Sequence, residues 1–205
     1  ACLVGSEMCI RDRYDASTQG YSFSKNFFSD MGAYAARNGD PNYFSMILFA
    51  MSLTIVGITF ISYYLLLPTL LGNDRINYIL TWLGTLFAIG GSVCMIGTGF
   101  TPSDVVFGPH VFFANNIFHC FLVTALFYTI VIFRSDGLPK RYAIGYAMFF
   151  LSILAYVIIL QYGPSVNSSE SALIFQVLSQ KVIVIVFCFS VIHQTYGFTK
   201  SGILK

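Results

Sequence analysis

The sequence predicts an all-α fold, a polytopic bundle of transmembrane helices with up-and-down topology. Hydrophobic residues make up 56% of the 205 residues, only 10% are charged, and the mean hydropathy is +0.73. Soluble domains carry about 25% charged residues, so this chain has too few charges to cover a water-facing surface. Five stretches are long and apolar enough to cross a bilayer. Because they are continuously apolar and do not alternate, they predict helices and not the strands of a barrel.

Short polar connections separate the five predicted spans. Gly, Pro, Asn and Asp in these connections end each helix, and connections this short make helices that are neighbours in sequence pack antiparallel. In the second span, Gly84, Ala88 and Ser92 recur every four residues, which predicts a central helix that its neighbours approach closely. The predicted spans are 43–71, 76–100, 111–133, 142–162 and 172–193, within a bundle formed by residues 43–198.

The remaining residues are predicted to lie outside the bilayer. Residues 14–42 form an outer loop with a Ser-Asp-x-Gly motif at 29–32, and residues 199–205 form a cytoplasmic tail. Residues 1–13 read like translated sequencing-adapter sequence, so we expect a non-native tail there. We further expect the full-length gene to encode about 20 apolar residues upstream of Tyr14, a sixth helix of the bundle.

The distribution of Lys and Arg predicts the orientation in the cell membrane. Basic residues concentrate in 134–141 and in the C-terminal tail, whereas the connections 101–110 and 163–171 contain none. By the positive-inside rule the C-terminus is cytoplasmic and the two connections without Lys or Arg are outside. Lys25 and Arg37, in the outer loop, are exceptions to this pattern.

The composition also limits the classes of partner that the protein can bind. A net charge of +2 with scattered basic residues makes no basic face, which excludes a nucleic-acid binder. The expected partner is membrane lipid. No cofactor is expected, and the sequence does not indicate a protein partner.

Polar residues gather on the predicted outer side and inside two spans. Asp30, Asp104 and His110 are the candidate catalytic residues, although Ser-Asp before Gly and Pro-Ser-Asp also form turns and caps. A polar group inside a membrane is energetically costly and is a functional candidate for that reason. The candidate binding residues are Ser29, Asn115, Asn116, His119, Gln176, Gln180 and Lys181.

A metal site is not predicted. His110 and His119 are nine residues apart, two and a half helical turns, so they lie on roughly opposite sides of a helix. Zinc sites take three or four ligands that converge on one point. A hydrogen bond to another helix is the simpler role for His119.

Lys181 falls near the middle of the last span, too deep for its side chain to reach water. Lipid exposure at that depth costs about 2.5–3.5 kcal/mol on insertion scales, so Lys181 is predicted to face the bundle interior. Its expected partners are the neighbours of Gln180, backbone carbonyls near the Gly-rich end of the second span, Asn115, Asn116 or Asp104. It is either a neutral amine held by hydrogen bonds or a group that holds an anionic head group.

Three motifs resemble a known family. They are Tyr21-Ser22-Phe23 with Asn26-Phe27-Phe28-Ser29-Asp30-Met31-Gly32, then Gly97-Thr98-Gly99-Phe100-Thr101-Pro102-Ser103-Asp104 with His110, and Gln180-Lys181. Over about residues 21–195 the chain resembles the domain-of-unknown-function 998 (DUF998) family of prokaryotic integral membrane proteins, distantly similar to DRAM-type proteins. The resemblance implies a six-helix bundle with one helix before the Ser-Asp-x-Gly loop. It implies no chemistry, because that family has no established activity.

Two functions remain open at the level of sequence. The first is a non-enzymatic bundle that binds a lipid or another amphiphile, with its polar cluster at the outer leaflet. The alternative is a membrane-embedded, hydrolase-like enzyme that acts on lipid head groups, for which the carboxylates and His110 must lie within reach of one another. Whether the protein is an enzyme is left open.

Overall fold

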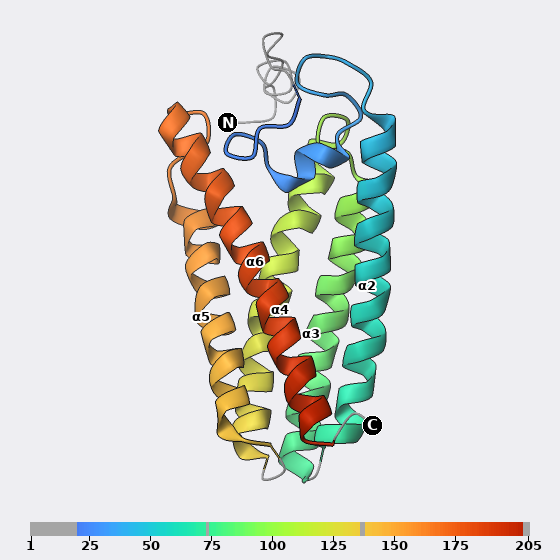
Figure 1. The fold of residues 1–205 in the computed structure, drawn as a ribbon, viewed down its shortest axis with the longest axis vertical. Helices are drawn as coiled ribbons and strands as arrows, with labels where there is room; N and C mark the ends of the chain where they lie inside the picture. Colours follow the sequence, from blue (N-terminus) through green and yellow to red (C-terminus); the bar gives the residue numbers. More distant parts are fainter. Residues whose placement is uncertain (1–19, 73, 136–137, 203–205) are drawn as a thin grey trace.

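The computed structural model describes residues 20–72, 74–135 and 138–202, and this part of the chain forms a bundle of long helices (Figure 1). Five of these helices are long and apolar enough to cross a membrane, which confirms the predicted fold class. The expected non-native tail at residues 1–13 lies outside the described residues. The elements are the short 3-10 helix η1 (Phe28–Gly32) and the α-helices α2 (Tyr43–Leu71), α3 (Arg75–Phe100), α4 (Phe107–Arg134), α5 (Lys140–Tyr162) and α6 (Glu170–Lys200).

The helices pack in the order of the sequence. α2 contacts α3, α3 contacts α4, α4 contacts α5, and α5 contacts α6, as short connections require. In Figure 1, α6 runs obliquely across the bundle. Aromatic rings join it to α2, with the ring centres of Phe60 and Phe187 5.3 Å apart. The result is the predicted up-and-down bundle.

The small residues of α3 lie where its neighbours approach most closely. Ala88 and Ser92 are fully buried, and a Cβ atom on Gly84 would lie 2.9 Å from the ring of Tyr128 in α4. Any side chain at position 84 would therefore push the two helices apart. The prediction that this helix is the central packing helix is confirmed, since α3 contacts both α2 and α4.

A proline inside α2 creates a problem that α3 solves. Pro68 has no N–H, so the carbonyl of Tyr64, four residues earlier, loses its usual partner. The hydroxyl of Thr85 in α3 donates a 2.9 Å hydrogen bond to that carbonyl. The Thr85 oxygen also lies 2.9 Å from the hydroxyl of Tyr128. Because the Thr85 hydroxyl has already donated its proton to the Tyr64 carbonyl, the Tyr128 hydroxyl is the donor in this hydrogen bond. We call this arrangement the hydroxyl tie; it links α2, α3 and α4.

α4 and α6 differ most from the predicted bounds. α4 begins at Phe107 and not at residue 111, because Pro109 fits the first turn of a helix, where no N–H is needed. α6 extends to Lys200 and not to residue 193, and Lys200 lies in the last turn, where a cation favourably faces the helix dipole. The first residues of the predicted cytoplasmic tail are therefore helical.

Residues 20–42, here named the cover segment, meet two helix connections at one end of the bundle, the covered end. The carboxylate of Asp104, in the α3–α4 connection, accepts hydrogen bonds from backbone N–H groups of the cover segment. Lys25 forms a 2.5 Å ion pair with Glu170 at the start of α6. At the opposite end Arg134 donates to the Asn77 side chain, 3.0 Å away. The three segments predicted to share one side of the membrane do lie together.

Candidate binding site at the covered end

The Ser-Asp-x-Gly motif folds into η1, and Asp30 organises it. The Asp30 Oδ2 atom accepts hydrogen bonds from the backbone N–H of Phe27 at 3.0 Å and from the side chain of Asn26 at 3.1 Å. The Asn26 side chain in turn accepts a 2.9 Å hydrogen bond from the backbone N–H of Ser22. Asp30 thus closes the first turn of η1 and joins it to the turn before it.

The end of η1 is anchored on α2. Gly32 packs so closely on Phe49 that a Cβ atom would lie 2.3 Å from its ring, which explains the glycine. The Asn42 side chain donates to the carbonyls of Met31 and Ala33, at 3.2 and 2.9 Å, and the Ser45 hydroxyl donates to the Met31 carbonyl at 2.8 Å. The first turn of α2 therefore holds the cover segment in place.

Asp104 anchors the rest of the cover segment from the α3–α4 connection. Its two carboxylate oxygens accept one hydrogen bond each, from the backbone N–H groups of Tyr34 at 2.9 Å and Ala35 at 2.8 Å. Charge-assisted bonds of this kind are stronger than neutral ones. The carboxylate is thus used to join two segments that are about 70 residues apart in sequence.

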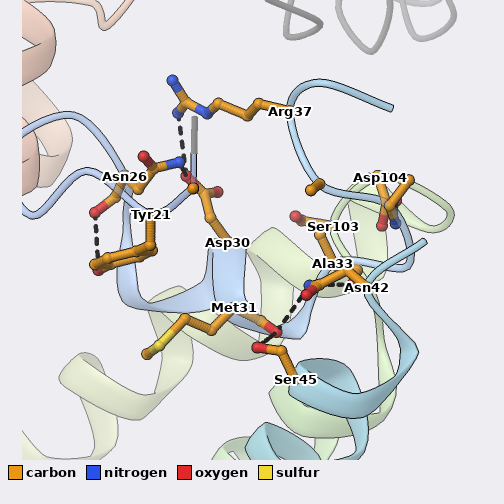
Figure 2. A pocket seen from close by; sticks show the side chains of 13 residues that line it. Tyr21, Asn26, Asp30, Met31, Ala33, Arg37, Asn42, Ser45, Ser103 and Asp104 are labelled. Atoms are coloured by element: carbon orange, nitrogen blue, oxygen red, sulfur yellow. Dashed lines mark hydrogen bonds and ion pairs between the residues drawn. The ribbon is translucent and has the colours of Figure 1, made fainter. Parts of the chain in front are cut away.

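A cavity of about 180 Å³ lies between these anchors (Figure 2). Ser103 lines it with only 4% of its surface exposed, and its hydroxyl makes no hydrogen bond with any residue that the structure describes. In Figure 2 this hydroxyl points toward the side of the cavity where Asp30 and Arg37 lie. The polar side chains around the cavity include those of Asp30, Arg37, Asn42, Ser45, Ser103 and Asp104.

The charge balance of the cavity depends on Arg37. One of its guanidinium nitrogens donates to Asp30 Oδ2 at 3.1 Å, in an ion pair that is largely shielded from solvent. Tyr21 lies on the same side of the cavity. Burial and then the negative charge of Asp30 raise the pKa of Tyr21 above 10.0, so its hydroxyl is protonated at neutral pH. Tyr21 therefore offers a hydroxyl and not a phenolate.

Lys181 is enclosed by the cover segment. Only 2% of its surface is exposed, and its Nζ atom donates hydrogen bonds to the Tyr21 hydroxyl at 2.5 Å and to the Asn26 carbonyl at 2.8 Å. The same atom lies 4.1–5.1 Å from the centres of three aromatic rings, those of Phe28, Phe23 and Tyr21. Rings at that distance attract a cation through their negative faces. We call this arrangement the lysine cradle.

The prediction that Lys181 faces the interior is confirmed, but the predicted partners were wrong. Neither Asn115, Asn116 nor Asp104 bonds to it; the cover segment descends between the helices and supplies the contacts. Neighbouring Gln180 accepts a 2.9 Å hydrogen bond from the backbone N–H of Phe28. Both members of the Gln-Lys motif therefore bind the cover segment.

His110 is not part of the cavity. It is buried in the first turn of α4, where its Nδ1 atom donates a 2.6 Å hydrogen bond to the Thr101 carbonyl. The structure thus brings Asp30 and Asp104 to one cavity and places His110 outside its lining. Among the described residues, no group of three or more His, Cys, Asp or Glu is placed to hold a metal ion.

The other candidate residues also lie outside the cavity lining. His119 donates to the Asn115 carbonyl at 2.9 Å and Asn116 to the Phe112 carbonyl at 2.8 Å, so both bond within α4 and not to another helix. Gln176 donates to the carbonyl of Ile159, near the end of α5, and to that of Pro164, in the α5–α6 connection, which joins α6 to that end of α5. Ser29 lies in η1 and makes no hydrogen bond with the described residues.

Sequence reasoning did not propose Arg37 or Tyr21 as site residues. One signal for Arg37 was available, because a basic residue on the predicted outer side departs from the positive-inside pattern. Such a departure indicates that the charge has a specific partner, here Asp30. Tyr21 gave no such signal.

Comparisons with known proteins add no relative. No protein-family model, no curated protein and no solved structure matches this chain. The resemblance to the DUF998 family stays a prediction from the motifs. What the fold defines is a multi-pass membrane protein with a small cavity, lined by both polar and apolar residues, at its covered end.

Proposed function

We propose that the protein is a non-enzymatic membrane bundle that binds the polar part of a lipid or another amphiphile in the cavity at its covered end. The distribution of Lys and Arg supports placing this end at the outer leaflet. The observation that carries the proposal is the Ser103 hydroxyl, which belongs to a buried residue, has no partner among the described residues and is directed into the cavity. A hydroxyl can donate and accept hydrogen bonds, so it is available to a bound ligand.

The hydrolase-like alternative rests on Asp30 and Asp104, which share the cavity. Both carboxylates hold the cover segment in place, one through an ion pair and the other through two backbone N–H groups. A general base has to be within hydrogen-bond reach of the proton it removes, and a carboxylate used as an anchor is poorly placed for that role. Binding without turnover therefore fits the contacts better.

Lipid retention tests the proposal. The wild-type protein is purified in mild detergent and its bound lipids are identified by native mass spectrometry. We expect the wild type to retain one lipid per protein. Ser24→Ala should retain it too, because the Ser24 side chain does not line the cavity, whereas Ser103→Leu should lose it, because the leucine fills the cavity. Equal retention by both variants, or no retained lipid in the wild type, contradicts the proposal. Release of a free head group from the retained lipid would establish the enzymatic alternative instead.

A further inference from the structure

The chemistry of the cavity indicates what kind of group it holds, on the basis of the proposed function. Its volume is about 180 Å³. A cavity of about 150 Å³ accommodates a six-membered ring such as benzene. The cavity therefore has room for one small ring or a three-carbon unit.

The groups that line the cavity still have both donors and acceptors to offer. Arg37 uses one of its three guanidinium nitrogens in bonds to the described residues, which leaves N–H donors on the others. Asp30 uses only Oδ2 within that same set, which leaves Oδ1 as an acceptor. The Ser103 hydroxyl can act either way.

This mixture discriminates between classes of ligand. A phosphate group only accepts hydrogen bonds and an ammonium group only donates them, so each would leave part of the lining without a partner. A hydroxyl group does both. A ligand with two or more hydroxyls can bond to Asp30, Arg37 and Ser103 together.

The charges in the lining also favour an uncharged ligand. Arg37 carries one positive charge and the two carboxylates carry two negative charges, so the lining does not attract an anion. Lys181 does not line the cavity and is enclosed by the lysine cradle. The arrangement therefore provides no basic site for a phosphate.

We infer that the cavity binds one uncharged, hydroxyl-rich group, a sugar or glycerol unit, which is carried by a lipid or is free in solution.

Nanodiscs of phosphatidylcholine test this inference. One preparation contains no further lipid, and the others contain a monoglucosyl diacylglycerol, phosphatidic acid or phosphatidylethanolamine. Glucose and glycerol are added separately to the preparation without further lipid. Binding is followed by native mass spectrometry. We expect selective binding of the glucosyl lipid. Loss of one hydrogen bond of about 1 kcal/mol should weaken it about fivefold in Ser103→Ala and in Arg37→Gln, but not in Ser24→Ala.

The outcomes separate the two proposals. Selective binding of phosphatidic acid or phosphatidylethanolamine overturns the inference and leaves the proposed function standing. Binding of free glucose or glycerol, but of no lipid, supports the ligand class and overturns the lipid part of the proposed function. Absence of binding to every probe overturns both. Ser103→Ala removes no hydrogen bond among the described residues, so a weaker complex in that variant reports on the ligand and not on folding.

Discussion

The lysine cradle and the hydroxyl tie satisfy buried polar groups in different ways. The tie uses Thr85, Tyr64 and Tyr128, which lie on three successive helices, and it involves no charge. The cradle holds the Lys181 ammonium with groups from the cover segment, more than 150 residues away in sequence. Helix side chains suffice for a hydroxyl, because one donor and one acceptor satisfy it.

The ammonium needs more than the helices provide. It has three N–H donors and a charge, and none of the five spans places a carboxylate within ion-pair distance of it among the described residues. The cover segment supplies a hydroxyl, a carbonyl and three ring faces in a single loop. The comparison shows that a charge inside this bundle is stabilised by a segment that precedes the five long helices in the sequence.

A double-mutant cycle tests the cradle and should give the largest effect. Tyr21→Phe keeps the ring but removes the hydroxyl that accepts from Lys181, and a hydrogen bond to a charged group is worth about 1.5–3 kcal/mol. We expect a loss of that size in the free energy of unfolding, measured in mixed micelles with a denaturing detergent. In a Lys181→Met background the same change should cost less, because only the bonds from the Tyr21 hydroxyl to the Asn26 and Phe27 carbonyls are then lost. Equal losses in both backgrounds would show that the hydroxyl does not serve the lysine.

Removal of the Thr85 hydroxyl tests the tie. Thr85→Val preserves the shape of the side chain but leaves the Tyr64 carbonyl without a donor, and we expect a loss of about 1–2 kcal/mol by the same measurement. Thr59→Val is the matched control, because the Thr59 hydroxyl bonds only to a carbonyl of its own helix and is exposed. A Thr85→Val protein as stable as the control would mean that the tie is not needed.

The Asp104 anchor should have a smaller, local effect. Asp104→Asn leaves one acceptor oxygen where two backbone N–H groups donate, so we expect a loss of about 1 kcal/mol. Hydrogen exchange should show it as faster exchange of the Tyr34 and Ala35 amides, with the amides of α3 unchanged. Uniformly faster exchange in all helices would show that Asp104 stabilises the whole bundle and not this segment.

The smallest effect is expected at the opposite end, where Asp74 caps α3. Hydrogen bonds from the backbone N–H groups of Asn77 and Ile76, together with Arg134, hold the pKa of Asp74 below 3.8. A carboxyl group with a lowered pKa in the folded state stabilises the protein above the unfolded-state value, and this contribution is lost as the pH falls toward the folded-state value. Melting temperatures from pH 7 to pH 3 should therefore fall slightly more for the wild type than for Asp74→Asn, whose amide caps without titrating. Parallel curves would exclude this contribution.

The sequence was sufficient for features that follow from hydrophobicity. It predicted the spans, the central position of α3 and the interior position of Lys181, because the cost of exposing or burying these groups is independent of the detailed fold. It predicted α4 to begin after Pro109, because proline usually ends helices. Proline lacks a backbone N–H, however, and a residue in the first turn of a helix needs none. The sequence therefore predicted the ends of the helices less accurately than the presence of the spans.

The cavity could not be predicted, because its walls come from two stretches that are far apart in the sequence, residues 20–45 and residues 103–104. Asp30 and Asp104 were recognised as polar residues on one side of the bundle, but which partner each carboxylate binds depends on the path of the cover segment. That path is set by long-range contacts such as the bond between Phe28 and Gln180, which no local pattern encodes. The pairing of Arg37 with Asp30 follows from the same path.

The separation in sequence between the cover segment and α6 also determines an order of assembly. Each pair of neighbouring helices can form a hairpin as soon as it is synthesised, since their contacts are sequential. The cover segment is made before all of them, yet its main partners, Gln180 and Lys181, are among the last residues to enter the membrane. Docking of this loop onto α6 therefore has to wait until α6 has been made, and a bundle in which the loop has not docked leaves Lys181 without the hydroxyl, the carbonyl and the rings that enclose it.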